Sequence, residues 1–216
     1  WVSDNVKYFI TPKVENDEDE YINILFNKCQ KNNIDLIIPL MDFEIPILAK
    51  NKDFFRKKNI EIVVSEYNIV KKCLDKKRNY KFCIENNINV PKTFFSESEI
   101  DVDFPLILKK IKGSGSIGQK IIRSYKEIDN FNDGDDLLQT FIEGQEYGMD
   151  VFNDFNGNYL HSFTREKLLM RGGETDKAKA VYSKTNISLG KRISEKFKHV
   201  GNMDIDYIKD NDGKIY

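Results

Sequence analysis

The chain has 216 residues, enough for one large domain or two small domains with a buried core. Its 34 basic and 35 acidic residues nearly cancel, so the net charge gives no reason to expect nucleic acid or a membrane as the partner. No apolar run approaches the ~18 residues of a membrane-spanning helix. The three cysteines lack metal-type spacing and indicate a reducing compartment, so we expect a cytoplasmic protein.

The first part of the chain alternates between strand and helix patterns. Two continuous apolar runs, residues 34–40 and 60–64, are typical of strands buried in a parallel sheet. A helix with one apolar face is expected around residues 21–29 and a short strand at 6–10. A further helix is expected from about 43 to 58, with Pro46 limiting where it can begin. This alternation predicts an α/β domain with helices packed on a parallel sheet.

A linker follows this domain. Asp75 is a good N-cap for a further helix, which the pair Asn86-Asn87 ends. Val90-Pro91 then breaks the pattern, because the residue before a proline avoids helical geometry. We therefore place the domain boundary near residue 90.

The second part of the chain has an antiparallel α+β pattern. The dipeptide Asn156-Gly157 predicts a β-hairpin, and the spacing of Ser124 and Glu127 predicts a capping box that opens a helix. The expected strands are at 106–108, 119–124, 137–142, 146–154, 158–164 and 203–209, the expected helices at 125–131 and 187–199, and residues 169–180 are expected to form a loop.

Glycines gather in one loop, GSGSIG, after the strand FPLILKK. Its spacing is G-x-G-x-x-G, but a dinucleotide-binding turn would open into a helix, and here the strand pattern QKIIRS follows. A P-loop requires Gly-Lys-Ser/Thr, whereas Gln119 follows the last glycine, and no D-F-G or H-R-D signature of a protein kinase occurs. What remains is a glycine-rich lid that lays backbone N–H groups over phosphates. Its residues are Gly113, Ser114, Gly115, Ser116 and Gly118.

Four segments occur in the order and spacing of one family: FPLILKK, GSGSIG, LLQTFIEGQEYGMDVF and GNMDIDYIKDNDGKIY. With them the chain resembles the ATP-grasp superfamily, and most closely its carbamoyl-phosphate synthase large-subunit-like members. The resemblance implies a Rossmann-like pre-ATP-grasp domain at residues 1–90 that lacks its first strand. A two-lobed ATP-grasp domain would follow, with a small lobe at 91–142 and a large lobe at 143–216 that is truncated at its C-terminus. ATP would lie between the lobes.

The resemblance also implies which residues hold the phosphates of ATP. Lys109 matches the basic residue that contacts the α and β phosphates, which suits a lysine as a point charge. Lys76 falls near a basic residue that reaches the nucleotide from the preceding helix, and Lys77 and Arg78 compete with it for this role. Where relatives have proline after the strand lysine, this chain has Lys110.

Further implied roles concern adenine, ribose and the acceptor. Thr140 and Ile142 would make backbone contacts to adenine, and Gln139 would turn its amide toward the adenine amino group. Glu146 would bind the ribose hydroxyls. Many relatives carry glutamate at one of the two positions occupied here by Gln139 and Thr140. Arg171 lies in the segment where relatives hold the acceptor, and it could grip a carboxylate or an acyl phosphate with two hydrogen bonds.

The expected metal ligands lie on the last predicted strand. Asp206 matches the first metal ligand of the family, and alternation along a strand places Asp204 on the same face. The metal would be Mg²⁺ or Mn²⁺, which prefer oxygen ligands. The family's other ligands, a Glu-x-Asn pair, would fall past Tyr216, so we expect a fragment that is inactive by itself.

The resemblance implies an ATP- and Mg²⁺-dependent ligase, which activates a carboxylate as an acyl phosphate for attack by an amine. Small-molecule carboxylates and amines are the expected partners, with no nucleic acid and no membrane, and a homo-oligomer is left open. An ATP-binding module without turnover is the alternative. A nicotinamide-dependent oxidoreductase is a weaker one, because the glycine loop precedes a strand rather than a helix.

Overall fold

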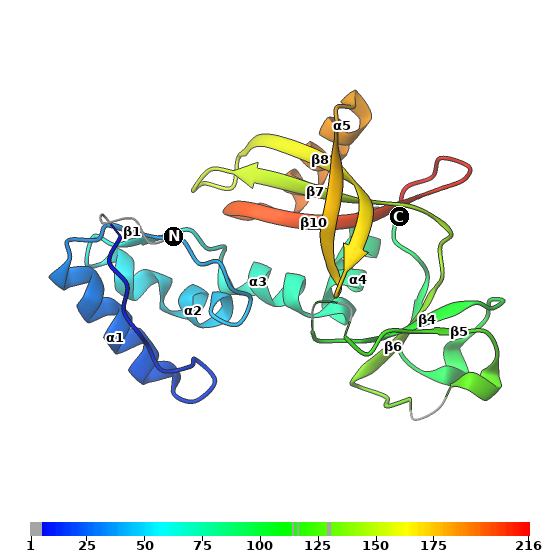
Figure 1. Ribbon diagram of the computed structural model, residues 1–216, viewed down its shortest axis with the longest axis horizontal. Coiled ribbons are helices and arrows are strands. Elements are labelled where there is room, and N and C mark those ends of the chain that lie inside the picture. Colours follow the sequence, from blue (N-terminus) through cyan, green and yellow to red (C-terminus); the bar gives the residue numbers. More distant parts are fainter. Residues whose placement is uncertain (1–5, 114, 116, 129–130) are drawn as a thin grey trace. The chain divides into compact units, whose positions relative to one another are not determined.

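A computed structural model of the chain describes residues 6–113, 115, 117–128 and 131–216. The predicted Ser114 and Ser116 of the lid lie outside the described residues. The chain forms two compact units, residues 1–70 and 71–216. The predicted order of an α/β part followed by an antiparallel α+β part is confirmed (Figure 1). The unit boundary lies before the helix that Asp75 caps, whereas the sequence pattern places the domain boundary near residue 90.

The first unit alternates helices with short parallel strands. Strands β1 (Leu36–Ile37) and β2 (Glu61–Ile62) pair in parallel, and helices α1 (Glu18–Lys31) and α2 (Ile45–Arg56) join its core around Phe55. Helix α1 begins where the Asp17 side chain accepts a hydrogen bond from the Glu20 amide, as an N-cap does. Helix α3 (Tyr67–Leu74) ends this unit and enters the next.

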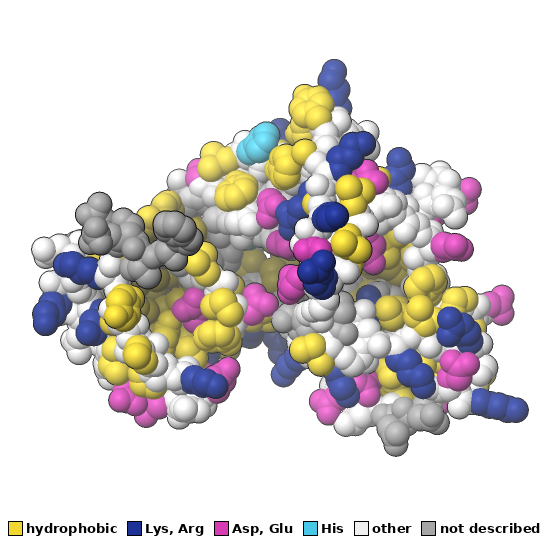
Figure 2. All heavy atoms as spheres, in the orientation of Figure 1, with side chains coloured by type: hydrophobic (Ala, Val, Ile, Leu, Met, Phe, Trp, Pro, Cys, Tyr) yellow, Lys and Arg dark blue, Asp and Glu magenta, His cyan; other side chains and the backbone are white. Residues whose placement is uncertain are grey.

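Two predictions for the first unit are wrong in detail. Residues 6–10 form no strand, and the run 34–40 is not buried throughout, since Ile38 is 60% and Leu40 83% exposed. Figure 2 shows apolar side chains at the surface of this unit. The reason is that β1 and β2 form a sheet of only two strands among the described residues, and so narrow a sheet cannot enclose the apolar run.

The second unit begins with helix α4 (Lys76–Glu85), capped by Asp75 as predicted. A first antiparallel sheet has the order β3-β6-β4-β5 and a core of Phe94, Leu106, Ile122 and Leu138. Its strands are β3 (Thr93–Phe94), β4 (Leu106–Lys110), β5 (Lys120–Ile122) and β6 (Asp136–Thr140). Strands β4 and β5 enclose the glycine loop, so the expected position of this loop between two antiparallel strands is confirmed.

The predicted helix over 125–131 is wrong in the described part, where Tyr125–Glu127 makes a single 3-10 turn. The Ser124 hydroxyl makes no capping hydrogen bond, and the Glu127 carboxylate accepts from the Arg123 amide, not from that of Ser124. The capping box therefore does not form, because its two reciprocal hydrogen bonds are missing.

A second antiparallel sheet has the order β10-β7-β8-β9. Its strands are β7 (Gly144–Asn153), β8 (Tyr159–Arg171), β9 (Glu174–Val181) and β10 (Gly201–Asp210). Helix α5 (Lys184–Phe197) packs on one face, where Leu189 meets Met149 and Val151 (Figure 1). Close packing needs Gly190, since a Cβ there would lie 2.7 Å from the Ser162 hydroxyl oxygen.

The expected loop at 169–180 is instead the end of β8, a Gly172-Gly173 turn and strand β9. Both glycines have positive φ, 59° and 86°, and two such residues form the tight turn that joins right-twisted strands. Strand β9 is an edge strand with mostly exposed side chains, so its sequence shows no apolar alternation. No helix in the described part of the chain is long and apolar enough to cross a membrane.

Candidate functional site

Strands β4 and β6 place Lys109 beside Gln139. The Lys109 ammonium donates a hydrogen bond of 2.8 Å to Gln139 Oε1, and Gln139 Nε2 donates one of 2.9 Å to Thr93 Oγ1. In the sheet register, Gln139 lies opposite Ile107, two residues before the lysine. The three side chains form a chain of hydrogen bonds that fixes the position of the ammonium group.

Helix α4 brings a second lysine to the start of the glycine loop. Lys76 Nζ donates a hydrogen bond of 2.7 Å to the Gly113 carbonyl oxygen, and the Lys76 amide donates to the Ile111 carbonyl at 3.0 Å. The two competing residues point elsewhere: Lys77 lies over the Phe95 ring, and Arg78 lies 3.6 Å from Asp75. Among these three cations, Lys76 is therefore the one that contacts the loop.

The environments of both lysines lower their pKa values. For Lys109 burial is the largest cause, followed by the positive charge of Lys76, while Glu146 and Asp206 act in the opposite direction. Burial also lowers the pKa of Lys76, with Asp75 opposing. Lys76, Glu146 and Asp206 are therefore near enough to Lys109 for their charges to affect its pKa. Two partly buried cations side by side favour an anion, because its charge would offset their repulsion.

The two lysines line a small cavity of about 110 Å³ together with Tyr80, Thr93 and Gln139. A neighbouring hollow of about 720 Å³ shares Asn79 and Val90 with it. Its lining includes apolar residues of α5 and β10, such as Leu189, Ile193 and Ile205, and the two acids Asp204 and Asp206. The small cavity is below the roughly 300 Å³ of a small-molecule site, so a nucleotide would have to extend beyond it.

The glycine loop meets the turn between β8 and β9. Gly113, Gly115 and Gly118 all have positive φ, which glycine adopts without strain. A Cβ on Gly173 would lie 2.2 Å from the carbonyl oxygen of Gly115, so the two backbones touch. The fold thus joins two segments that the sequence predicts as a lid and as an acceptor loop. Arg171, at the end of β8, is 78% exposed in its side chain and pairs with Asp176 at 2.9 Å.

The predicted adenine segment connects the two sheets. Strand β6 ends at Thr140, and β7 begins at Gly144, so Ile142 lies between them and is half-buried. The Thr140 amide donates to the Lys92 carbonyl at 2.9 Å, and the Thr140 hydroxyl is buried with no hydrogen-bond partner among the described residues. The Thr140 amide is therefore engaged within the protein, and this residue retains a buried hydroxyl that could form a hydrogen bond.

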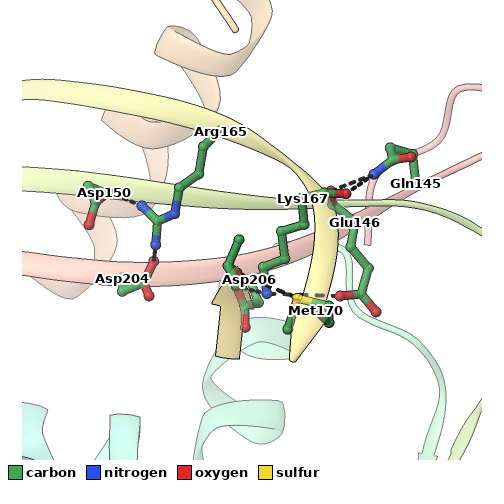
Figure 3. A network of polar contacts seen from close by, with 9 residues as sticks. Gln145, Glu146, Asp150, Arg165, Lys167, Met170, Asp204 and Asp206 are labelled. Atoms are coloured by element: carbon green, nitrogen blue, oxygen red, sulfur yellow. Dashed lines mark hydrogen bonds and ion pairs between the residues drawn. The ribbon is translucent and has the colours of Figure 1, made fainter. Parts of the chain in front are cut away.

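One face of the second sheet carries a network of acids and bases (Figure 3). Lys167 lies 2.7 Å from Asp206 and 3.9 Å from Glu146. Arg165 lies 3.0 Å from Asp204 and also pairs with Asp150. Asp204 and Asp206 share this face, as alternation along β10 predicts. The sequence did not predict Arg165 and Lys167 as site residues, because the strand was expected to end at 164. Alternation along a longer strand would have placed both side chains on one face of the sheet.

The acids on β10 suit a hard divalent cation. Mg²⁺ is usually held by one or two carboxylates, with water and phosphate oxygens completing its octahedral shell. Asp204 and Asp206 supply such oxygens, and no cluster of three or more His, Cys, Asp or Glu side chains is present among the described residues. Burial raises the pKa of Asp204, as do Asp206 and Asp150, whereas Arg165 opposes this shift. A second positive charge would therefore stabilise its carboxylate.

Comparisons with known proteins agree with this architecture. A family model described as "ATP-grasp domain" matches residues 73–216, and one described as "PylC-like, N-terminal domain" matches residues 2–63. A carbamoyl-phosphate synthase of Methanobrevibacter smithii is 27% identical over 140 residues, which are 59% of this chain and 37% of that protein. The chain thus spans little more than a third of the length of this relative.

Solved structures share the fold. One is the biotin carboxylase domain dimer of 2-oxoglutarate carboxylase from Hydrogenobacter thermophilus, in complex with MgADP, ADP and bicarbonate. It is 17% identical, with a TM-score of 0.72 over 92% of this chain and 50% of that one. Another is an L-amino acid ligase from Bacillus licheniformis, 18% identical, with a TM-score of 0.68 over 95% of this chain and 53% of that one.

Proposed function

Because the chain belongs to the ATP-grasp family, we propose that it binds ATP with Mg²⁺ or Mn²⁺ and serves the ATP-dependent joining of a carboxylate to an amine. One observation carries this proposal: helix α4 and strands β4, β7 and β10 bring Lys76, Lys109, Glu146 and Asp206 close enough for their charges to affect the pKa of Lys109, and Lys76 also contacts the glycine loop. Two cations beside two acids are what a nucleotide phosphate and its metal require.

In this proposal the two lysines hold the phosphates. Lys109 would exchange the Gln139 amide oxygen for a phosphate oxygen, which forms a stronger hydrogen bond because the acceptor then carries a negative charge. Lys76 would move from the Gly113 carbonyl, and the backbone amides of the loop would close over the phosphates. Glu146 would accept hydrogen bonds from the ribose, and Thr140, Ile142 and Gln139 would contact adenine.

The metal would be bound by Asp206 and Asp204, and it would neutralise charge on the phosphates. The γ-phosphoryl group then passes to a carboxylate oxygen, which yields ADP and an acyl phosphate. An amine displaces inorganic phosphate from that carbon and forms the C–N bond. Arg171, at the tip of the β8–β9 hairpin, would hold the carboxylate or the acyl phosphate with its guanidinium group.

The relatives support the class of reaction. Their names include a carbamoyl-phosphate synthase and an L-amino acid ligase, and one structure contains MgADP and bicarbonate. We extend this class to the present chain, with small-molecule carboxylates and amines as substrates.

The three free thiols, Cys29, Cys73 and Cys83, support a reducing, cytoplasmic location. Self-association is included in the proposal because the 2-oxoglutarate carboxylase domain is described as a dimer.

Calorimetry with Mg²⁺·ATP and with NAD tests the binding step. We expect ATP to bind and NAD to give no heat, and binding of NAD alone would contradict the proposal. The chemical step is tested by adding hydroxylamine with candidate carboxylates, since hydroxylamine traps an acyl phosphate as a hydroxamate. Formation of hydroxamate and ADP that depends on both ATP and the carboxylate is the expected result.

An ATP-binding module without turnover is the second candidate. The departures from the family pattern at Lys110, Gln139 and Thr140 favour it, since relatives usually carry proline at the first of these positions and often glutamate at one of the other two. ATP binding without hydroxamate or ADP, over a set of carboxylates that includes bicarbonate and amino acids, would select this candidate. Hydroxamate formation with any of them would exclude it.

A further inference from the structure

Two basic side chains reach across a whole strand of the second sheet. Arg165 and Lys167 start on β8, and their acidic partners Asp204 and Asp206 are on β10, with β7 between them. Two strand spacings amount to about 10 Å, so only long side chains can bridge them. Both cations therefore lie flat over β7 (Figure 3).

Gly148 on β7 makes this crossing feasible. In the sheet register Gly148 faces both Arg165 and Asp206. A Cβ on Gly148 would stand 3.0 Å from Arg165 Nε and 3.1 Å from Cζ, which is tighter than an ordinary contact. The missing side chain leaves a shallow channel over the middle strand, and the guanidinium group occupies it.

Lys167 is the buried member of its cluster. Its side chain is 8% exposed, whereas the side chains of Glu146 and Asp206 are 53% and 69% exposed. The ammonium group lies 2.7 Å from Asp206 Oδ1, so it occupies one of the two carboxylate oxygens to which a cation could bind directly. The lysine thus neutralises the very carboxylate to which the proposed function assigns the metal.

We propose that Lys167 is a positioning residue that competes with the divalent cation for Asp206 and so makes metal binding depend on the nucleotide. This inference rests on the proposed function. A cation that binds Asp206 through Oδ1 must displace the ammonium group, which has a second acid nearby in Glu146, at 3.9 Å in this structure. A bound nucleotide offsets the free-energy cost of this displacement, because its phosphates give the released ammonium group a new negatively charged partner. When the metal binds without a nucleotide, the displaced ammonium group gains no such partner, so the metal binds weakly.

A lysine that merely stabilised the sheet would behave differently. Its removal would leave Asp206 less well oriented, so metal binding would weaken or stay the same. Competition predicts the opposite sign: without the ammonium group, Asp206 and Glu146 keep their negative charges, and a cation meets no competitor at Asp206. The sign of the change in metal affinity therefore separates the two roles.

The experiment titrates the whole chain with Mn²⁺ alone and reads free Mn²⁺ by electron paramagnetic resonance. Lys167→Met should bind Mn²⁺ about tenfold more tightly than the wild-type chain, since one unit of opposing charge is removed at short range. Lys167→Arg keeps the charge and should resemble wild type. Lys196→Met, which removes an exposed lysine on α5, controls for net charge and should change the affinity by less than about twofold. Equal or weaker Mn²⁺ binding in Lys167→Met would overturn the inference.

Metal-free ATP binding, measured on the same samples, separates this inference from the proposed function. If wild type and Lys167→Met both bind ATP but bind Mn²⁺ equally, the competition is wrong and the nucleotide site stands. If neither protein binds ATP with or without metal, the proposed function itself is wrong. Thermal unfolding of each variant shows that it is folded; should Lys167→Met not fold, Lys167→Gln, which also removes the charge, takes its place under the same outcomes.

Discussion

The carbonyl oxygen of Gly115 faces Gly173 so closely that a Cβ on Gly173 would stand 2.2 Å from it. Gly115 belongs to the glycine loop between β4 and β5, and Gly173 to the turn between β8 and β9. The loop that would cover the phosphates is thus in backbone contact with the hairpin that carries Arg171. This contact tolerates no side chain at Gly173, so it can be tested by adding a single methyl group.

Gly173→Ala should lower the affinity for ATP about tenfold, because the added Cβ pushes the glycine loop away from the hairpin. Gly172→Ala is the matched control: Gly172 also has positive φ, 59°, but no atom of the described residues lies within 4 Å of its Cβ position. Both variants carry the backbone strain, which costs about 1 kcal/mol, and only the first carries the clash. Calorimetry with ATP compares them, and equal affinities in the two variants would show that the contact has no role in binding.

Lys109→Ala should weaken ATP binding by about 1.5 to 3 kcal/mol, the range of a hydrogen bond to a charged group, or roughly tenfold to a hundredfold. Lys126→Ala is the control, because Lys126 is exposed on the 3-10 turn after β5. Calorimetric titration with Mg²⁺·ATP measures both. If the two variants bind ATP alike, Lys109 is not in the site.

Asp206→Asn should bind Mg²⁺·ATP and ATP alone with the same affinity, because the asparagine amide keeps the shape of the side chain but lacks the negative charge that binds Mg²⁺. In the wild-type chain we expect Mg²⁺ to increase the affinity. Asp212→Asn, in the exposed turn after β10, should behave like wild type. Should Asp206→Asn retain the full Mg²⁺ effect, the metal lies elsewhere.

His199 should make the second unit sensitive to acid. Its Nε2 donates to the Val151 carbonyl at 2.9 Å, which leaves Nδ1 as the acceptor that faces the Asn153 amide at 3.3 Å. Burial lowers the pKa of His199 below its ordinary value of 6.5, although the hydrogen bond to Val151 opposes this shift. A second proton would also place two donors against each other.

The sign of this pH dependence follows from linkage. Between the lowered pKa and 6.5 the unfolded chain binds more protons than the native protein. The contribution of His199 to the free energy of unfolding is therefore fully present above about pH 6.5 and decreases as the pH falls below that value. His199→Gln should flatten this fall between about pH 7 and 5, whereas His161→Gln, at an exposed position, should leave it unchanged. Urea unfolding at a series of pH values measures it; parallel pH curves for wild type and His199→Gln would exclude His199 as the cause.

Local patterns in the sequence determined most helices and one turn. Helices α1 and α5 form where apolar periodicity occurs, and α4 begins at its Asp75 cap, because these signals act within a few residues. The Asn156-Gly157 pair likewise marks the hairpin between β7 and β8. The position of Lys109 before a glycine loop also followed from the sequence, since strand and loop adjoin in the chain.

Only the tertiary structure decided which charges meet. Lys167 and Asp206 are 39 residues apart, and their ion pair depends on a sheet order that places β7 between their strands. The edge strand β9 and the exposed run 34–40 depended in the same way on which neighbours each segment has. A sequence pattern states what a residue can do locally, whereas burial, ion pairing and backbone contact such as that of Gly115 with Gly173 depend on residues far along the chain, which no local signal specifies.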